Sequence, residues 1–81
     1  MKVTVKFWSY FCDLTECDET SLEINEGATL GELHAAVMKK FPKLGEMKNS
    51  TLKAVGVDYQ TDDFVLSEGD EVSLFPPVQG G

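Results

Sequence analysis

The sequence predicts an α+β fold in which one main helix covers one face of a mixed β-sheet. Three observations support this prediction. Apolar and polar residues alternate near both ends of the chain, one internal segment repeats its apolar residues at helical spacing, and 81 residues are enough for only one domain. Strand segments on both sides of a single amphipathic helix are typical of a sheet that packs its apolar face against that helix.

The first half of the chain is predicted to begin with a hairpin. The stretch from Lys2 to Phe11 alternates in polarity, so we expect a half-buried strand. Its inward-facing set is Val3, Val5 and Phe7. An acidic loop from Cys12 to Glu19 separates it from a second alternating segment, Thr20 to Asn25. Two strands joined by a short polar loop favour an antiparallel hairpin.

A capping box marks the start of the predicted helix. The side chain of Thr29 can accept a hydrogen bond from the backbone of Glu32, and the side chain of Glu32 can reach back to the backbone of Thr29. Behind this box the apolar residues recur at helical spacing: Leu30, Leu33, Val37 and Phe41. Pro42 is expected to end the helix, because proline cannot continue its hydrogen bonding.

The second half is predicted to return to the sheet in three strands. The segments are Thr51–Val57, Phe64–Leu66, which is predicted to be a short strand or an extended segment, and Glu71–Phe75. In the last strand Val72 and Leu74 are expected to face inward, after a turn that uses Gly69 at a positive φ. The order is β-β-α-β-β-β, and we expect the two ends of the chain to supply neighbouring central strands. This is the β-grasp, or ubiquitin-like, plan.

The charge balance restricts the classes of partner. Seven basic and fourteen acidic residues give a net charge of −7 at pH 7. Such a surface repels phosphate groups, so we expect neither a nucleic-acid partner nor a membrane-surface role. Two cysteines cannot make a disulfide framework, and no secretory signal is visible after Met1. The prediction is therefore a cytoplasmic protein with reduced thiols.

The usual catalytic and metal-binding motifs are missing from the sequence. His34 lies on the flank of the apolar helix stripe, and we expect it to be partly exposed and without a catalytic role. Cys12 and Cys17 have no further ligands at a suitable spacing, so we interpret them as free thiols and not as a metal pair. No metal or cofactor is predicted to bind this chain.

The C-terminal tail carries the feature that points to a function. We divide the chain into a β-grasp domain, residues 1–75, and an extended tail, residues 76–81. The tail residues are Pro76, Pro77, Val78, Gln79, Gly80 and Gly81. The prolines have fixed φ and no N–H donors, so they favour a stiff, extended segment, and the glycines lack Cβ atoms and can enter a narrow channel. A stiff segment followed by two glycines is suited to a protein that presents its own α-carboxylate to another protein's active site.

Two aromatic residues mark a candidate partner interface beside the tail. If Val72 and Leu74 face inward, the period of two puts Phe75 on the outer face of the last strand. The same count puts Trp8 on the outer face of the first strand. Large aromatic side chains on a solvent-facing sheet surface are typical of interface cores, so we assign both residues to an interface.

The end of the sequence resembles a known family. Gly69-Asp70-Glu71-Val72, followed by Phe75-Pro76-Pro77-Val78 and Gly80-Gly81, is similar to the ending of the MoaD/ThiS sulfur carriers. The double proline favours the branch formed by the small subunits of molybdopterin synthase over the thiamin sulfur carriers. Length and element order agree over the whole chain, whereas Cys12-Asp13 replaces an Arg-Glu pair that is common in the first loop of the family.

The resemblance implies a carrier mechanism. An adenylating partner, similar to ubiquitin-activating enzymes, would use ATP to activate the carboxylate of Gly81, and a sulfur donor would convert it to a thiocarboxylate. The large subunit of molybdopterin synthase would then deliver the sulfur to cyclic pyranopterin monophosphate in molybdenum cofactor biosynthesis. In this account Gly81 carries the reacting group, Gly80 allows passage, and the catalytic base belongs to the large subunit.

Other classes of function stay open. An activated Gly81 attacked by a substrate lysine would make the chain a ubiquitin-like protein modifier, and a thiamin-type sulfur carrier would use the same tail. A plain β-grasp interaction module with an incidental tail is the remaining class. Lysine conjugates ending in Gly-Gly would identify the modifier. Removal of Gly80 and Gly81 without any effect would identify the interaction module.

Overall fold

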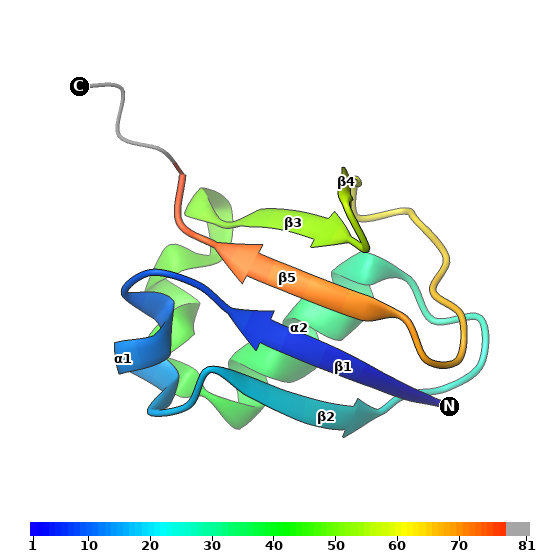
Figure 1. Cartoon of the computed structure of the whole chain (residues 1–81), viewed down its shortest axis with the longest axis horizontal. Coiled ribbons are helices and arrows are strands. Elements are labelled where there is room, and N and C mark those ends of the chain that lie inside the picture. Colours follow the sequence, from blue (N-terminus) through cyan, green and yellow to red (C-terminus); the bar gives the residue numbers. More distant parts are fainter. Residues whose placement is uncertain (78–81) are drawn as a thin grey trace.

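The computed structural model describes residues 1–77, apart from the side chains of Lys48 and Asn49. These residues form one five-stranded mixed sheet (Figure 1). The strands are β1 (Lys2–Phe7), β2 (Glu19–Glu23), β3 (Leu52–Val55), β4 (Asp58–Tyr59) and β5 (Glu71–Phe75). Their order is β2-β1-β5-β3-β4, in which β1 and β5 are parallel and the other neighbours antiparallel. The two ends of the described chain therefore supply neighbouring central strands, as predicted.

The main helix covers one face of this sheet. Helix α2 (Leu30–Lys40) lies behind the central strands in Figure 1 and packs against the inward side chains of β1 and β5. The core includes Val3, Val5, Phe7, Leu30, Leu33, Val37, Val72 and Leu74. Each of these side chains is at most 2% exposed. The α+β fold and its inward-facing residues are confirmed.

The start of α2 is fixed by two sets of hydrogen bonds. The backbone N–H of Glu32 donates to Thr29 Oγ1 at 3.2 Å, and the N–H of Thr29 donates to Glu32 Oε1 at 3.3 Å, so the predicted capping box forms. The N–H of Gly31 donates to the carbonyl of Asp62 at 2.9 Å. The connection between β4 and β5 is thereby held against the first turn of the helix.

The first strand is shorter than predicted, and a helix replaces part of the acidic loop. β1 ends at Phe7, and α1 (Phe11–Thr15) follows after a turn. Ser9 has a positive φ of 56°, which interrupts the extended backbone, and the side chain of Phe11 turns into the core. A helix of five residues is too short for apolar periodicity to reveal it.

The second half also contains a helix and a hairpin that the sequence did not predict. A 3₁₀ helix, η1 (Pro42–Ser50), fills the polar connection after α2. β3 ends at Val55, because Gly56 adopts a φ of +63° and turns the chain into the short strand β4. Within residues 1–77, no helix is long and apolar enough to cross a membrane.

Of the two alternatives for Phe64–Leu66, a short strand or an extended segment, the strand is wrong. This segment makes one isolated bridge, between Thr29 and Val65, and is not part of the sheet. Leu66 is instead buried as a core residue, with 3% of its surface exposed. The short apolar run thus reflects packing and not strand pairing.

Candidate functional site at the tail end of the sheet

The tail begins where β5 ends. Phe75 is the last strand residue, and Pro76 and Pro77 follow with half-buried side chains and no regular secondary structure. In Figure 1 this end of β5 lies beside the end of β1, so the tail starts from the centre of the sheet. The predicted site residues that lie outside the described part of the chain are Val78, Gly80 and Gly81. Their roles, and the division of the chain at residue 76, stay predictions.

The two predicted interface residues lie next to each other at this end. Phe7 is opposite Leu74 in the parallel pairing of β1 with β5. The pairing continues one residue further, because the N–H of Trp8 donates to the carbonyl of Leu74 at 3.1 Å. Trp8 therefore lies beside Phe75, just beyond the last residue of β1. Trp8 is 50% exposed and Phe75 is half-buried.

Two further side chains extend this surface, and sequence reasoning missed both. Leu52 of β3 is opposite Phe75 in the antiparallel register. The ring of Tyr59, on β4, meets the ring of Phe75 edge-on, with the ring centroids 5.6 Å apart. Alternation along β3 separates Leu52 from Lys53 but does not say which of them faces solvent, and a two-residue strand carries no pattern that could reveal Tyr59. We call Trp8, Leu52, Tyr59 and Phe75 the tail-end patch.

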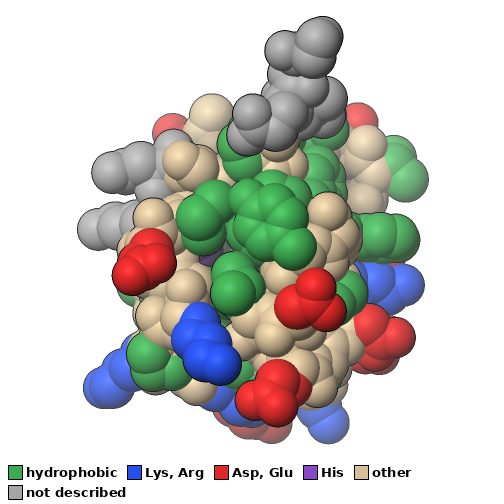
Figure 2. All heavy atoms as spheres, turned by 90° about the vertical axis from the view of Figure 1, so that its left-hand side faces the viewer, with side chains coloured by type: hydrophobic (Ala, Val, Ile, Leu, Met, Phe, Trp, Pro, Cys, Tyr) green, Lys and Arg blue, Asp and Glu red, His purple; other side chains and the backbone are tan. Residues whose placement is uncertain are grey.

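The tail-end patch is the apolar part of a mainly polar sheet face. Further along the outer face, Lys6 of β1 and Glu71 of β5 form an ion pair of 3.5 Å. Figure 2 views the molecule from the end that carries the patch and shows hydrophobic side chains gathered at its centre, with charged side chains around them. Exposed aromatic rings surrounded by polar residues are typical of a protein-binding surface.

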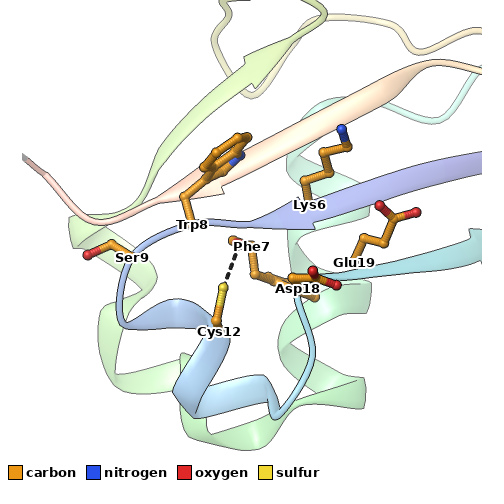
Figure 3. Close-up of a pocket in the computed structure, with 7 residues that line it drawn as sticks. All are labelled: Lys6, Phe7, Trp8, Ser9, Cys12, Asp18 and Glu19. Carbon is orange, nitrogen blue, oxygen red and sulfur yellow. Dashed lines mark hydrogen bonds between the residues drawn. The ribbon is translucent and has the colours of Figure 1, made fainter.

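A hollow of about 300 Å³ adjoins the patch on the side of α1 (Figure 3). It is lined by Lys6, Phe7, Trp8, Ser9, Cys12, Asp18 and Glu19. In Figure 3 the side chain of Trp8 points away from α1, whereas the thiol of Cys12 points from α1 toward β1. Cys12 Sγ donates to the carbonyl of Phe7 at 2.8 Å, so this thiol helps to hold α1 against the end of β1. The hollow has room for a partner's side chain beside Trp8.

No group of three or more His, Cys, Asp or Glu side chains within residues 1–77 is placed to hold a metal ion. Cys12 and Cys17 are free thiols and are partly buried. The hydroxyl of Thr15 lies between their backbones, where it donates to the carbonyl of Cys17 at 2.9 Å. Both cysteines thus lie in the packing of α1 against the core.

His34 is buried, contrary to the prediction that it is partly exposed. Its ring is 5% exposed, and its Nδ1 lies 3.5 Å from Nζ of Lys53. The same Nζ lies 2.9 Å from Oδ1 of Asp62. The prediction failed because Lys53 faces inward from β3 and covers this flank of α2. His34, Lys53 and Asp62 form a cluster on the inner side of β3. Leu52 of the tail-end patch is on the outer side of the same strand, so His34 belongs to the packing of the fold and not to the patch.

A sequence model of the ThiS family matches residues 6–81, which include the tail. This chain belongs to the ThiS family. The molybdopterin synthase sulfur carrier subunit of Mycobacterium tuberculosis is 34% identical to it over 76 residues, a match that covers 89% of this chain and 92% of that protein. The family resemblance seen in the last residues therefore extends over nearly the whole chain.

Solved structures of similar proteins share the fold. A Pyrococcus furiosus protein named as molybdopterin converting factor subunit 1 is 32% identical, with a TM-score of 0.89 over 96% of this chain and 99% of that one. A chain in the complex of subunits 1 and 2 of the Helicobacter pylori molybdopterin-converting factor is 27% identical, with a TM-score of 0.72 and full coverage of both chains. Small archaeal modifier protein 1 of Haloferax volcanii has a TM-score of 0.88, over 95% of this chain and 98% of that one, and at 18% identity this likeness shows the fold alone. The predicted β-grasp, ubiquitin-like fold is confirmed.

Proposed function

We propose that this chain is the sulfur-carrier small subunit of molybdopterin synthase. The observation that carries the proposal is its match, over nearly its full length, to a family and to a relative named as such a subunit. The geometry of the described residues supports it. An exposed apolar surface lies at the base of the tail, where a partner that receives the tail has to dock.

The proposed chemistry begins with activation of the Gly81 carboxylate. One carboxylate oxygen attacks the α-phosphorus of ATP in an adenylating partner, and pyrophosphate leaves. The resulting acyl adenylate has a good leaving group, which a bare carboxylate lacks. A sulfur donor at the oxidation level of sulfide then attacks the acyl carbon and AMP leaves, so that a thiocarboxylate remains on Gly81 and no electrons are exchanged.

Sulfur delivery follows in the large subunit of molybdopterin synthase. A thiocarboxylate is ionised at neutral pH, so its sulfur is available as a nucleophile, as it is in a thiolate. The sulfur forms a carbon–sulfur bond to cyclic pyranopterin monophosphate in place of a carbon–oxygen bond of that substrate, on the way to the dithiolene of molybdopterin. Water then hydrolyses the resulting thioester, so the sulfur stays on the pterin and Gly81 regains its carboxylate. This chain supplies the sulfur and a slim tip through Gly80, while the base and the substrate pocket belong to the large subunit. The Helicobacter pylori complex, in which a similar subunit 1 is assembled with a subunit 2, supports a large-subunit partner.

The tail-end patch couples docking to delivery. Phe75 is the last residue of β5, and its ring contacts Tyr59, so a partner that grips the patch also holds the residue from which Pro76 and Pro77 depart. The direction of the tail then depends on the docked surface. Because a misplacement of about 1 Å can cost on the order of a hundredfold in rate, the fit of the patch against the partner also affects the rate of sulfur delivery.

The proposal is tested by intact mass spectrometry. The purified chain is incubated with an adenylating enzyme of this family, ATP and a sulfide source. We expect a mass increase equal to the difference between a sulfur and an oxygen atom, and its loss when the large subunit and cyclic pyranopterin monophosphate are added. A chain that never gains sulfur with any such enzyme would contradict the proposal. Gly81 linked to lysine side chains, without sulfur delivery, would assign the chain to the modifiers instead.

A further inference from the structure

The outer edge of β2 is open to another strand. β2 and β4 are the two edges of the sheet, and β2 has five residues whereas β4 has two. The N–H of Ile24 donates to the carbonyl of Met1 at 2.8 Å, and the N–H of Phe7 donates to the carbonyl of Asp18 at 2.9 Å. Even-numbered residues on this strand therefore bond to β1, and the odd-numbered ones direct their N–H and C=O groups away from the sheet.

The outward-facing residues of β2 carry a defined charge pattern. They are Glu19, Ser21 and Glu23. On the outer face, Glu19 is opposite Lys6 and Glu23 is opposite Lys2 in the pairing with β1. Opposite charges directly across a strand pair stabilise it, and like charges destabilise it. From β1 to β2 the charge on the outer face changes from positive to negative. A strand added outside β2 continues this alternation of charge if it places basic residues opposite both glutamates. These basic residues are then four positions apart.

A second copy of this chain does not fit the edge. Antiparallel pairing about Ser21 would put Glu19 of one copy opposite Glu23 of the other, and a parallel arrangement would also face glutamates with glutamates. The net charge of −7 opposes the approach of the two copies as well. The charges that protect the edge from self-association leave it complementary to a basic strand.

The space beside the edge fits small side chains. A hollow of about 250 Å³ lies between β2 and α2 and is lined by Glu23, Ile24, Asn25, Ala28, Glu32 and Ala36. Ala28 and Ala36 are small, and this leaves room that larger residues would fill. Side chains of an added strand alternate between the two faces of the sheet. Those that do not face Glu19 and Glu23 therefore point toward this hollow.

We propose that the β2 edge binds an extended segment of a partner protein by strand addition, with two Lys or Arg residues four positions apart and small residues between them. β1 is an example of this pattern. Its segment Lys2-Val3-Thr4-Val5-Lys6 pairs with the other edge of β2 and places Lys2 opposite Glu23 and Lys6 opposite Glu19. In Figure 1 β2 lies on the far side of β1 from β5, β3 and β4, which carry three of the four residues of the tail-end patch. Both surfaces can therefore be occupied at once, and the proposal does not depend on the chemistry of Gly81.

The test is an NMR titration of the isotope-labelled full chain with two capped peptides. The first, Lys-Val-Thr-Val-Lys, copies residues 2–6, and the second, Lys-Val-Thr-Lys-Val, has the same composition with its lysines on opposite faces. We expect the first peptide to shift the amide signals of Glu19, Ser21 and Glu23 and to bind about threefold more tightly than the second, from one correctly placed charge pair. Equal affinities, no binding, or shifts confined to the tail-end patch would overturn the proposal.

Matched variants separate strand pairing from general charge attraction. Glu23→Lys should lower the affinity for the first peptide about fivefold, because an attractive cross-strand pair becomes a repulsive one. Glu46→Lys makes the same change in net charge at an exposed position of η1 and should leave the affinity within about twofold of the original. Equal losses in both variants would mean that only net charge matters. Ser21→Pro removes an outward N–H without changing the charge, and its spectrum shows whether the fold is kept; an unchanged affinity in a folded variant would also overturn the proposal.

Discussion

The two faces of β5 differ in what they contact, and the difference separates stability from recognition. On the inner face Val72 and Leu74 are fully buried under α2. On the outer face Phe75 is only half-buried, and its neighbour Trp8 is 50% exposed. One strand of five residues thus anchors the fold with its inner side chains and starts the tail with its last residue. Changes on the inner face should act on unfolding, and changes on the outer end or the tail should act on partners.

The largest expected effect comes from the last residue of the chain. Deletion of Gly81 should abolish sulfur loading, because it removes the proposed reacting carboxylate from its position at the tip. The free energy of unfolding should stay within about 0.5 kcal/mol of the original value, since removal of one terminal residue usually changes stability little. Intact mass after the loading reaction, together with urea denaturation, measures both quantities.

Gly80→Ala is the milder variant at the same tip. The added Cβ restricts the backbone and widens the chain, so loading or delivery should slow without being lost. An equal loss of loading in Gly80→Ala and in the deletion variant would mean that passage through the channel, and not the identity of the last residue, limits the reaction. Sulfur loading at full rate after deletion of Gly81 would remove the carrier proposal altogether.

The inner face gives the largest expected effect on stability. Leu33 is fully buried in the α2 stripe, and Leu33→Ala should lower the free energy of unfolding by about 2–5 kcal/mol, because a cavity remains against the sheet. Urea denaturation followed by circular dichroism measures this. Lys39→Ala, at an exposed position of the same helix, should change stability by less than about 0.5 kcal/mol. Partner affinity of the folded Leu33→Ala protein should be unchanged, and a large loss of affinity would break the separation between the two faces.

The sequence predicted the parts of the fold that have a repeating pattern. The alternation around Val5 and Val72 and the helical spacing of Leu30 and Val37 are direct consequences of strands and a helix that each bury one side. Helix α1 has no such repeat, because it is one short turn held by the burial of Phe11 and by a left-handed Ser9. Its formation depends on tertiary packing, which a local pattern does not contain.

The candidate site was predictable to the same extent. Strand alternation places Phe75 on the outer face, but Tyr59 reaches it from β4 across β3, which lies between β4 and β5 in the sheet. The burial of His34 has the same kind of cause, since Lys53 covers it from a strand that is distant in sequence. Residues that join a site through a crossover in the sheet cannot be found from the spacing within one segment.

A substitution of His34 tests whether a residue on the inner side of the sheet affects stability without affecting sulfur loading. His34→Ala removes a buried ring and a neighbour of the Lys53 ammonium, so the free energy of unfolding should fall by about 1–3 kcal/mol. Sulfur loading of the folded variant should be unchanged, because the ring lies on the inner side of β3. A thermal melt and the loading reaction test the two statements separately. Loss of loading in a folded variant would give His34 a functional role that its position does not suggest.

The smallest expected effects concern the tail-end patch, where the two faces meet in one residue. Phe75→Ala removes the edge-on contact with Tyr59, so it should cost about 1 kcal/mol of stability, less than Leu33→Ala. It should also weaken binding to the proposed large subunit or the proposed activating enzyme by more than about 1 kcal/mol, if the ring anchors the surface from which the tail departs as we propose. Titration calorimetry with each partner, beside a thermal melt, measures the two effects.

Trp8→Ala sharpens the comparison, because Trp8 is in the same patch but does not carry the tail. It should weaken partner binding less than Phe75→Ala does, and it should hardly change the melting temperature, since an exposed ring leaves no cavity. An unchanged affinity in Phe75→Ala together with a steep drop in melting temperature would mean that Phe75 serves the core alone. The outer end of β5 would then stabilise the fold just as its inner face does, and the partner would have to recognise the tail without the patch.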